Sequence, residues 1–207
     1  MTGYKLLYFT VRGRGEAIRL LLAENGIEFE EASPTPWPEY KPKMPFGQVP
    51  CFYDGDFQLV QSNAILRYLA RKHDLYGSSL QSQAKIDMLN DGVEDVRNTY
   101  VKLIYQNYEA GKEEYIKNLP NALQPFENLL TASDAGVTGA SVDGKRSFVD
   151  YNLFDLLDIR CVLAPNCLSE FPPLKAFYDK IASDPKISAY RQTEGFKTRS
   201  INGNGKQ

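Results

Sequence analysis

The sequence predicts an α/β part followed by an all-α part, the latter arranged as a helical bundle. Two observations support this fold class. The first third of the 207-residue chain alternates between the hydrophobic period of strands and that of helices, whereas the rest keeps the helical period. A chain of this length can also hold two small domains that each bury a core. We therefore expect a βαβ-ββα order over residues 1–76 and helices after it.

The βαβ unit follows from three segments. Residues 5–11 have the pattern of a strand. Residues 15–25 carry apolar side chains at helical spacing and stop at Gly26, and residues 27–31 alternate again. Residues 33–45 contain five prolines, which predicts a loop between this unit and the next.

Residues 46–70 predict a hairpin followed by a helix, and the two junctions have the chemistry of half a binding site. Pro50 permits a cis peptide bond and leaves the backbone of Val49 free to pair with a peptide-like ligand. Ser62 opens the helix, where its hydroxyl and unpaired N–H groups can bind a carboxylate. A strand edge that begins with proline and a serine that caps its helix explain the same residues equally well.

Residues 77–82 predict a linker, after which helical spacing dominates. Two helical stretches are expected around Pro120 and Pro125. Residues 135–145 contain three glycines, which predicts a loop.

A central helix is predicted over residues 151–159, because this segment is apolar on most faces. Ser147 and Asp150 precede it with the spacing of a capping box, in which each side chain accepts a hydrogen bond from a backbone N–H group. The cap explains Asp150 without any substrate. We therefore interpret Asp150 as structural rather than catalytic.

Composition and charge narrow the possible partners. Hydrophobic residues make up 43% of the chain and charged residues 24%, as in ordered globular proteins, and the net charge of -2 gives no electrostatic reason to expect nucleic acid or an anionic membrane as partner. The N-terminus lacks the layout of a signal peptide, and no apolar run reaches the roughly 20 residues needed to span a bilayer. We expect a cytoplasmic protein.

The cysteines and the single histidine exclude several chemistries. Cys51, Cys161 and Cys167 contain no C-x-x-C pair, which argues against a disulfide framework, a zinc site and a dithiol oxidoreductase. We expect reduced thiols and no metal. His73 lies in a charged run at a helix end, where the helix dipole favours a surface residue, so a histidine-based triad is not expected.

Tyr8 and Arg14 lie around the first junction between strand and helix. A phenol at the end of the strand can donate a hydrogen bond into a cleft, and the N-terminus of the helix favours anions. The glycines on either side of Arg14 lack the third glycine of a dinucleotide motif. Position alone favours interpreting Tyr8 as a buried strand aromatic.

Six segments carry a family resemblance: residues 8–14, 46–50, 61–65, 90–95, 104–111 and 202–207. In this order they closely resemble cytosolic glutathione transferases of the pi class, and the match spans essentially the whole chain. The resemblance implies a thioredoxin-like, glutathione-binding domain over residues 1–76 and a linker over residues 77–82. It also implies an all-helical domain over residues 83–207 that forms much of the electrophile pocket, a homodimer, and glutathione as co-substrate without any cofactor.

The resemblance assigns glutathione-binding roles residue by residue. Tyr8 is the hydroxyl that hydrogen-bonds the glutathione sulfur and holds it as thiolate. Val49 pairs its backbone with the cysteinyl unit beside a cis Pro50, while Gln61 and Ser62 hold the γ-glutamyl end. The other implied residues, at the glycyl end or supplying positive charge near the sulfur, are Trp37, Lys41, Gln48 and Arg14.

Two further assignments concern the dimer. Asp95 reaches the γ-glutamyl amine of glutathione in the other subunit, and Phe46 stands where the family uses an aromatic key in the dimer interface. Met44 stands where pi-class enzymes carry a reactive cysteine, so thiol-based regulation at that position is not expected here. The segment between Trp37 and Gly47 is also two residues shorter than the mammalian pattern, and Lys41 matches only if the gap lies before it.

The electrophile pocket is implied by positions that need only be apolar and adaptable. Tyr105 is also expected to donate a hydrogen bond to some substrates. The matching residues are Phe9, Thr10, Val11, Tyr105, Asn202 and Gly203.

The expected function is attack by glutathione thiolate on small, apolar electrophiles, as in detoxification of xenobiotics. The alternative is a weakly catalytic carrier that binds apolar ligands or partner proteins through the same pocket. Tyr8 and the complete glutathione set favour the enzyme. Thiol-disulfide exchange by the thioredoxin-like domain is disfavoured, because no cysteine occupies the first turn between strand and helix.

Overall fold

The computed structural model describes residues 3–131, 137–138, 141–142 and 146–207. The chain divides into two compact units, one formed by Met1–His73 with Pro185–Gly205 and the other by Asp74–Asp184 with Lys206–Gln207. The division predicted from the sequence differs from this grouping at Pro185–Gly205, which it assigns to the helical domain. The predicted domain boundaries stay a prediction.

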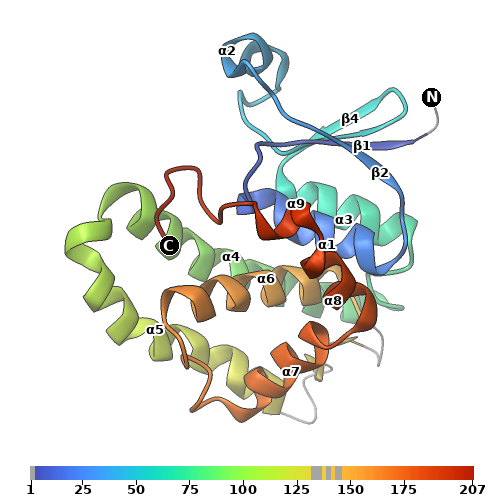
Figure 1. Ribbon diagram of the computed structural model, residues 1–207. Coiled ribbons are helices and arrows are strands. Elements are labelled where there is room, and N and C mark those ends of the chain that lie inside the picture. Colours follow the sequence, from blue (N-terminus) through green and yellow to red (C-terminus); the bar gives the residue numbers. More distant parts are fainter. Residues whose placement is uncertain (1–2, 132–136, 139–140, 143–145) are drawn as a thin grey trace. The chain divides into compact units, whose positions relative to one another are not determined.

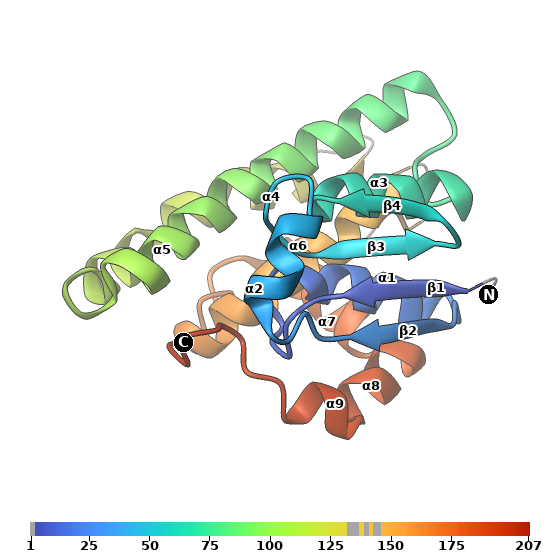
Figure 2. The same ribbon diagram turned by 90° about the horizontal axis from the view of Figure 1, so that it is seen from above.

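The first unit is built on a four-stranded sheet in the order β2-β1-β3-β4 (Figure 2). β1 pairs parallel with β2 and antiparallel with β3, and β3 forms a hairpin with β4. This mixed sheet confirms the predicted thioredoxin-like topology. The strands are β1 (Tyr4–Leu7), β2 (Phe29–Ala32), β3 (Cys51–Asp54) and β4 (Phe57–Val60).

Helices lie on both sides of this sheet (Figure 1). On one side are α1 (Glu16–Glu24), which follows the 3-10 turn η1 (Gly13–Gly15), and α3 (Ser62–Lys72). The other side carries α2 (Trp37–Tyr40), which is followed by the 3-10 turn η2 (Lys41–Lys43).

The prediction of a loop over residues 33–45 is therefore wrong at α2 and η2. Pro38 and Pro42 lie in the first turns of these two elements. A proline is tolerated there because the first N–H groups of a helix have no partner within the helix. The prolines thus allow the short helical turns that their number argued against.

The C-terminal segment of the first unit returns to α1. It contains α8 (Pro185–Gln192) and α9 (Glu194–Lys197), and α8 packs against α1. Beyond α9, the backbone N–H groups of Arg12 and Gly13 donate to the carbonyls of Ser200 and Ile201, at 2.8 and 3.0 Å. The tail is thereby attached to the chain just after β1.

The second unit is helical. α6 (Phe148–Leu163) is buried along most of its length and packs against α4 (Leu80–Gln106) and α7 (Pro172–Ala182), while α5 (Tyr108–Thr131) packs against α4 and α7. Two short strands, β5 (Val137–Thr138) and β6 (Ser141–Val142), pair antiparallel inside the segment predicted as a loop. The other residues of that segment lie outside the described part of the chain. None of the helices in the described ranges is both long and apolar enough to cross a membrane.

α5 corrects the expectation of two separate helical stretches, because it runs through Pro120 and Pro125. Both prolines are exposed, whereas Leu119, Leu123 and Phe126 are buried at helical spacing. Each proline removes one donor from the helix, but the buried face continues across both positions. Packing of that face outweighs the missing hydrogen bonds.

The capping box before α6 is present as predicted. The backbone N–H of Ser147 donates to Asp150 Oδ2 at 2.6 Å, and both residues are buried. A buried carboxylate that accepts a backbone N–H at a helix start is well suited to a structural role. The capping box supports the interpretation of Asp150 as a structural residue.

Candidate active site

Tyr8 lies one residue beyond the end of β1 and is half-buried. Its backbone N–H donates to the Ala32 carbonyl at 2.9 Å, which keeps it attached to the sheet. Its hydroxyl accepts a hydrogen bond from the backbone N–H of Arg14 at 2.8 Å. Accepting this bond does not use the phenolic proton.

Two glycines make room for the Tyr8 ring. A Cβ atom added at Gly13 would lie 2.5 Å from Tyr8 Oη, and one added at Gly15 would lie 2.7 Å from ring atom Cδ1. Gly13 also has a φ of +39°, a backbone conformation that other residues rarely adopt. The Gly-Arg-Gly segment thus leaves space for the Tyr8 phenol rather than forming part of a dinucleotide motif.

Arg19 holds the loop that follows Tyr8. This buried guanidinium donates from Nη1 to the Val11 carbonyl at 2.9 Å and to Glu16 Oε2 at 3.0 Å, and from Nε to Glu31 Oε1 at 2.5 Å. It also lies 5.7 Å from the centroid of the Tyr8 ring. The loop is therefore tied to both α1 and β2.

The charges around Arg19 keep it ionised. Burial alone would lower the pKa of Arg19, but the carboxylates of Glu16 and Glu31 reverse this effect and raise the pKa above its ordinary value. Tyr190 donates to Glu16 Oε1 at 2.7 Å, and Arg199 donates to Glu31 Oε2 at 2.8 Å. Burial, followed by the nearby Glu16 carboxylate, raises the pKa of Tyr190, so that its hydroxyl stays protonated.

The peptide bond between Val49 and Pro50 is cis, as predicted. The Val49 side chain packs against a cluster that contains Leu7, Met44 and Cys51. Within the part of the chain that the structure describes, the backbone of Val49 makes no hydrogen bond. Its N–H and carbonyl groups are therefore available to an extended ligand.

Gln61 and Ser62 occupy the start of α3. Gln61 is the N-cap and has a φ of +73°, while Ser62 is the first helical residue. No side chain caps this helix, so the alternative of Ser62 as a capping residue is wrong. Among the described residues, the Ser62 hydroxyl has no hydrogen-bond partner. A hydroxyl and the first N–H groups of a helix together form a site suited to a carboxylate.

Gln61 and Gln48 come from different segments and meet in space. Gln61 Nε2 lies 3.4 Å from Gln48 Oε1, in donor geometry. Lys41 is exposed, and its aliphatic carbons lie beside Gly47, 3.5 Å from where a Cβ would be. Polar residues of the predicted set thus occur both before and after the cis peptide bond in the sequence.

Phe9 and Trp37 continue the surface from Tyr8 toward α2. The Phe9 ring is 6.0 Å from the Tyr8 ring and packs edge-on to Trp37 at 5.4 Å between centroids. Thr10 is exposed and Val11 is half-buried. The structure brings these residues together around the end of β1.

The tail adds Asn202 and Gly203 to the same unit. Val11 forms an isolated parallel β-bridge with Ser200, two residues before Asn202, which is buried. Gly203 is exposed. Tail positions predicted to contact the electrophile are therefore attached to the loop that carries Phe9, Thr10 and Val11.

The remaining predicted residues are exposed. Asp95 and Tyr105 lie on α4 of the second unit, and Tyr105 is 55% exposed. Phe46 precedes the cis peptide bond in the first unit and is 67% exposed.

Two family models match this chain. The model described as the glutathione S-transferase N-terminal domain matches residues 4–71, and the one described as the glutathione S-transferase C-terminal domain matches residues 94–194. The chain belongs to the glutathione S-transferase family.

The chain is similar to glutathione S-transferases of the pi class. Glutathione S-transferase P 1 of Bufo bufo is 51% identical over 208 residues, covering 99% of each chain, and glutathione S-transferase P of Homo sapiens is 48% identical over the full length of both. A solved pi-class glutathione S-transferase of Onchocerca volvulus aligns over the whole of both chains with a TM-score of 0.92 and 42% identity. The resemblance to pi-class transferases is confirmed.

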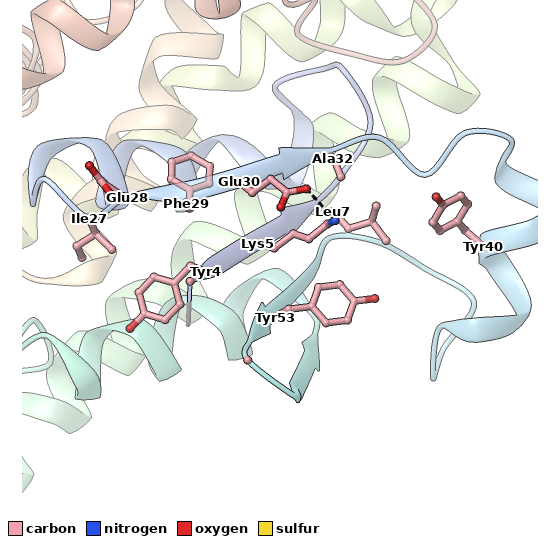
Figure 3. A pocket seen from close by; sticks show the side chains of 12 residues that line it. Tyr4, Lys5, Leu7, Ile27, Glu28, Phe29, Glu30, Ala32, Tyr40 and Tyr53 are labelled. Carbon is pink, nitrogen blue, oxygen red and sulfur yellow. Dashed lines mark ion pairs between the residues drawn. The ribbon is translucent and has the colours of Figure 1, made fainter. Parts of the chain in front are cut away.

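A hollow of this glutathione S-transferase lies elsewhere in the first unit (Figure 3). It has a volume of about 1120 Å³, and its lining includes Leu7, Tyr40 and Tyr53. None of the residues predicted to bind glutathione or the electrophile lines it. Its Lys5 Nζ and Glu30 Oε1 pair with each other at 2.8 Å, so these charges already have partners. Size alone does not make this hollow the reactive centre.

The sequence did not predict the cluster around Arg19, which holds the loop after Tyr8. Arg19 lies between Ile18 and Leu20, and a charge within a strongly apolar helix was the available signal for a buried ion pair. Tyr190 and Arg199 bind the two carboxylates that pair with Arg19. Both are far from Arg19 in the sequence, so no local pattern connects them. No group of three or more potential metal ligands occurs among the residues that the structure describes.

Proposed function

We propose that the protein conjugates glutathione to small hydrophobic electrophiles through a thiolate that Tyr8 stabilises. Membership of the glutathione S-transferase family supports the reaction class. The observation that carries the mechanism is the 2.8 Å hydrogen bond from the Arg14 N–H to the Tyr8 hydroxyl. This bond orients the phenol and polarises its O–H group, which makes it a better donor to a sulfur anion.

The required stabilisation matches what such a site can supply. A thiol with a pKa near 8.5 needs a decrease of roughly 2 units to be mostly ionised at neutral pH, which corresponds to about 3 kcal/mol. One charge-assisted hydrogen bond contributes about 1.5–3 kcal/mol. The helix N-terminus that begins at η1, together with Arg14, contributes the remainder. Tyr8 acts throughout as a neutral donor.

Glutathione binding rests on its peptide backbone and its two carboxylates. The unpaired backbone of Val49 supports pairing with the cysteinyl unit beside cis Pro50. The hydroxyl of Ser62 and the first N–H groups of α3 suit the γ-glutamyl carboxylate, with Gln61 beside them. Trp37, Lys41 and Gln48 take the glycyl end.

The electrophile is proposed to bind beside the sulfur, on Phe9, Thr10, Val11, Asn202 and Gly203. The attachment of the tail to the chain after β1 supports this grouping. Tyr105 is proposed to complete the pocket and to donate a hydrogen bond to some substrates. The thioredoxin-like domain over residues 1–76 thus binds glutathione, while the helical domain over residues 83–207 contributes to the electrophile pocket.

We further propose a cytoplasmic homodimer. Phe46 serves as the aromatic key in the interface, and its ring, 67% exposed in the single chain, is accessible to a partner. Asp95 reaches the γ-glutamyl amine bound to the other subunit. A protomer without its partner would therefore lack one charged contact to glutathione.

The test is a conjugation assay with 1-chloro-2,4-dinitrobenzene at saturating glutathione. Replacing Tyr8→Phe should reduce kcat/KM by about 10–100-fold, because it removes one charge-assisted hydrogen bond. Tyr178→Phe is the matched control, since its hydroxyl donates to Asp158 at 2.6 Å in the second unit. The mechanism is wrong if Tyr8→Phe is as fast as the parent, and the enzyme assignment is wrong if the parent has no glutathione-dependent rate above background.

A further inference from the structure

Two cysteine side chains meet at the end of α6. Cys161 lies in the last turns of this helix and Cys167 in the turn that follows it. Their Sγ atoms are 3.9 Å apart, and both are free thiols with partial exposure. Their spacing in the sequence does not predict a pair, because they do not form a C-x-x-C motif.

The backbone after α6 explains the approach. Ala164 closes the helix by donating to the Arg160 carbonyl at 2.8 Å, and the Cys167 N–H donates to the Ala164 carbonyl at 3.1 Å. Between them, Asn166 has a φ of +69°, which turns the chain back on itself. Cys167 is thereby folded back toward the last turns of the helix, next to Cys161.

We propose that Cys161 and Cys167 form a thiol-disulfide exchange site, which glutathione disulfide converts into an intramolecular disulfide. The Sγ atoms are in van der Waals contact, and a bond of about 2.05 Å requires them to approach by roughly 2 Å. Cys167 lies in a turn, where such a movement disturbs no helical hydrogen bond. This site is independent of the proposed conjugation, because neither cysteine belongs to the glutathione or electrophile set.

The surroundings assign different roles to the two sulfurs. The contact with the Cys161 thiol lowers the pKa of Cys167 and outweighs its burial, and the charge of Arg160 acts in the same direction. The pKa of Cys161 is raised by the same contact with Cys167, then by burial, and then by the carboxylates of Asp158 and Asp179. The positive charge near Cys167 and the carboxylates near Cys161 therefore favour Cys167 as the attacking thiolate and Cys161 as the resolving thiol.

The exchange proceeds in two balanced steps. The Cys167 thiolate attacks one sulfur of glutathione disulfide, which forms a mixed disulfide and releases one glutathione thiolate that takes up a proton. Cys161 then loses its proton and attacks the Cys167 sulfur, which forms the intramolecular disulfide and releases the second glutathione. In sum, two protein thiols are oxidised and one glutathione disulfide is reduced to two glutathione molecules.

Cys51 provides an internal control. It is fully buried in β3, where Gln58 Nε2 lies 3.3 Å from its sulfur. Glutathione disulfide has no access to it in the folded protein, so it should keep its thiol. The folded chain should therefore lose two thiols and retain one.

The experiment treats the full-length reduced protein with glutathione disulfide, quenches it with acid and alkylates the remaining thiols after denaturation. Intact mass and peptide mapping should reveal a Cys161–Cys167 disulfide without bound glutathione, and Cys51→Ser should react like the parent. Cys161→Ser should accumulate one glutathione on Cys167, whereas Cys167→Ser should react at least about 10-fold more slowly, because the thiol with the raised pKa remains.

Three results would overturn the proposal. The parent could keep all three thiols under a large excess of glutathione disulfide, or it could form only disulfides between chains. Alternatively, Cys161→Ser and Cys167→Ser could accumulate bound glutathione at equal rates, which would contradict the assigned roles. Circular dichroism of each variant separates these outcomes from loss of the fold.

Discussion

Gly13 leaves no space for a side chain beside the Tyr8 hydroxyl. A methyl group there would lie 2.5 Å from Oη, so Gly13→Ala should displace the phenol from the Arg14 N–H. We expect kcat/KM for conjugation to decrease at least about 10-fold, since a small misplacement of a catalytic group costs at least that much. Steady-state kinetics with varied glutathione measures this effect.

Gly26→Ala is the matched control for that variant. Gly26 also has a positive φ, of +65°, but nothing lies within 4 Å of its added Cβ. The left-handed backbone should cost about 1–2 kcal/mol of the free energy of unfolding in both variants. Activity should fall only in Gly13→Ala, and equal activity losses in the two variants would contradict the packing argument.

Ser62 and Ser79 both lie at the start of a helix. Replacing Ser62 with alanine should affect glutathione binding, whereas replacing Ser79 should affect stability. Ser62 caps nothing, so Ser62→Ala should raise KM for glutathione about 10-fold, the loss of one hydrogen bond to a charged group, at unchanged stability. Ser79 accepts the Ser82 N–H at 3.1 Å, so Ser79→Ala should cost about 1 kcal/mol of unfolding free energy at unchanged KM. A Ser62→Ala variant that loses stability and keeps its KM would reverse the interpretation.

For individual residues, the sequence predicts an interaction only where the two interacting residues are close in the sequence. The opening of α3 at Gln61 and Ser62 and the capping box at Ser147 and Asp150 follow from neighbouring residues. The Arg19 cluster does not, because its carboxylates lie on α1 and β2 and its other members on the C-terminal segment. Pairing of that kind is fixed by the fold rather than by spacing.

The pair α4 and α6 is joined by buried charges. Arg97 Nη1 donates to Asp155 Oδ2 at 3.0 Å and Nη2 to Asn152 Oδ1 at 2.7 Å, with almost no exposure. Asp155→Ala leaves the guanidinium buried without this carboxylate. We expect a loss of about 3 kcal/mol in the free energy of unfolding, as for other broken buried pairs.

Asp179→Ala serves as its control. Asp179 pairs with Lys175 at 2.5 Å within α7, but both side chains are more than half exposed. Solvent screening limits such a pair to about 0.5 kcal/mol. Urea unfolding of both variants measures the contrast, and similar losses for the two would mean that burial does not govern these ion pairs.

Among whole elements, periodicity predicted α1, α3 and α6 because one or more of their faces are buried in a regular order. Its predictions are wrong at α2 and α5 for a common reason, because a proline in the sequence predicts the end of a helix wherever it lies. Pro38 lies in a first turn, and Pro120 and Pro125 lie on an exposed face. The position of a proline within a helix decides its effect, and position becomes known only with the fold.

At the scale of the whole molecule, the fold class was predictable but the grouping of the C-terminal segment was not. Alternating periods in the first third and helical periods afterwards follow from local burial. The return of Pro185–Gly205 to the first unit depends on α8 packing against α1 and on the bridge between Val11 and Ser200. Contacts so distant in the sequence leave no periodic signal.

A substitution at Phe46 tests the proposed homodimer. If Phe46 is the aromatic key of a homodimer, Phe46→Asp places a charge in an apolar interface and should raise the dissociation constant at least about 30-fold. Val162→Asp, another exposed apolar position at 46% exposure, is the control and should leave assembly unchanged. Sedimentation velocity across a concentration series measures both variants. The monomeric variant should also bind glutathione more weakly, because it lacks Asp95 of the other subunit. A Phe46→Asp protein that remains dimeric, or a parent protein that is monomeric, would contradict the role assigned to Phe46.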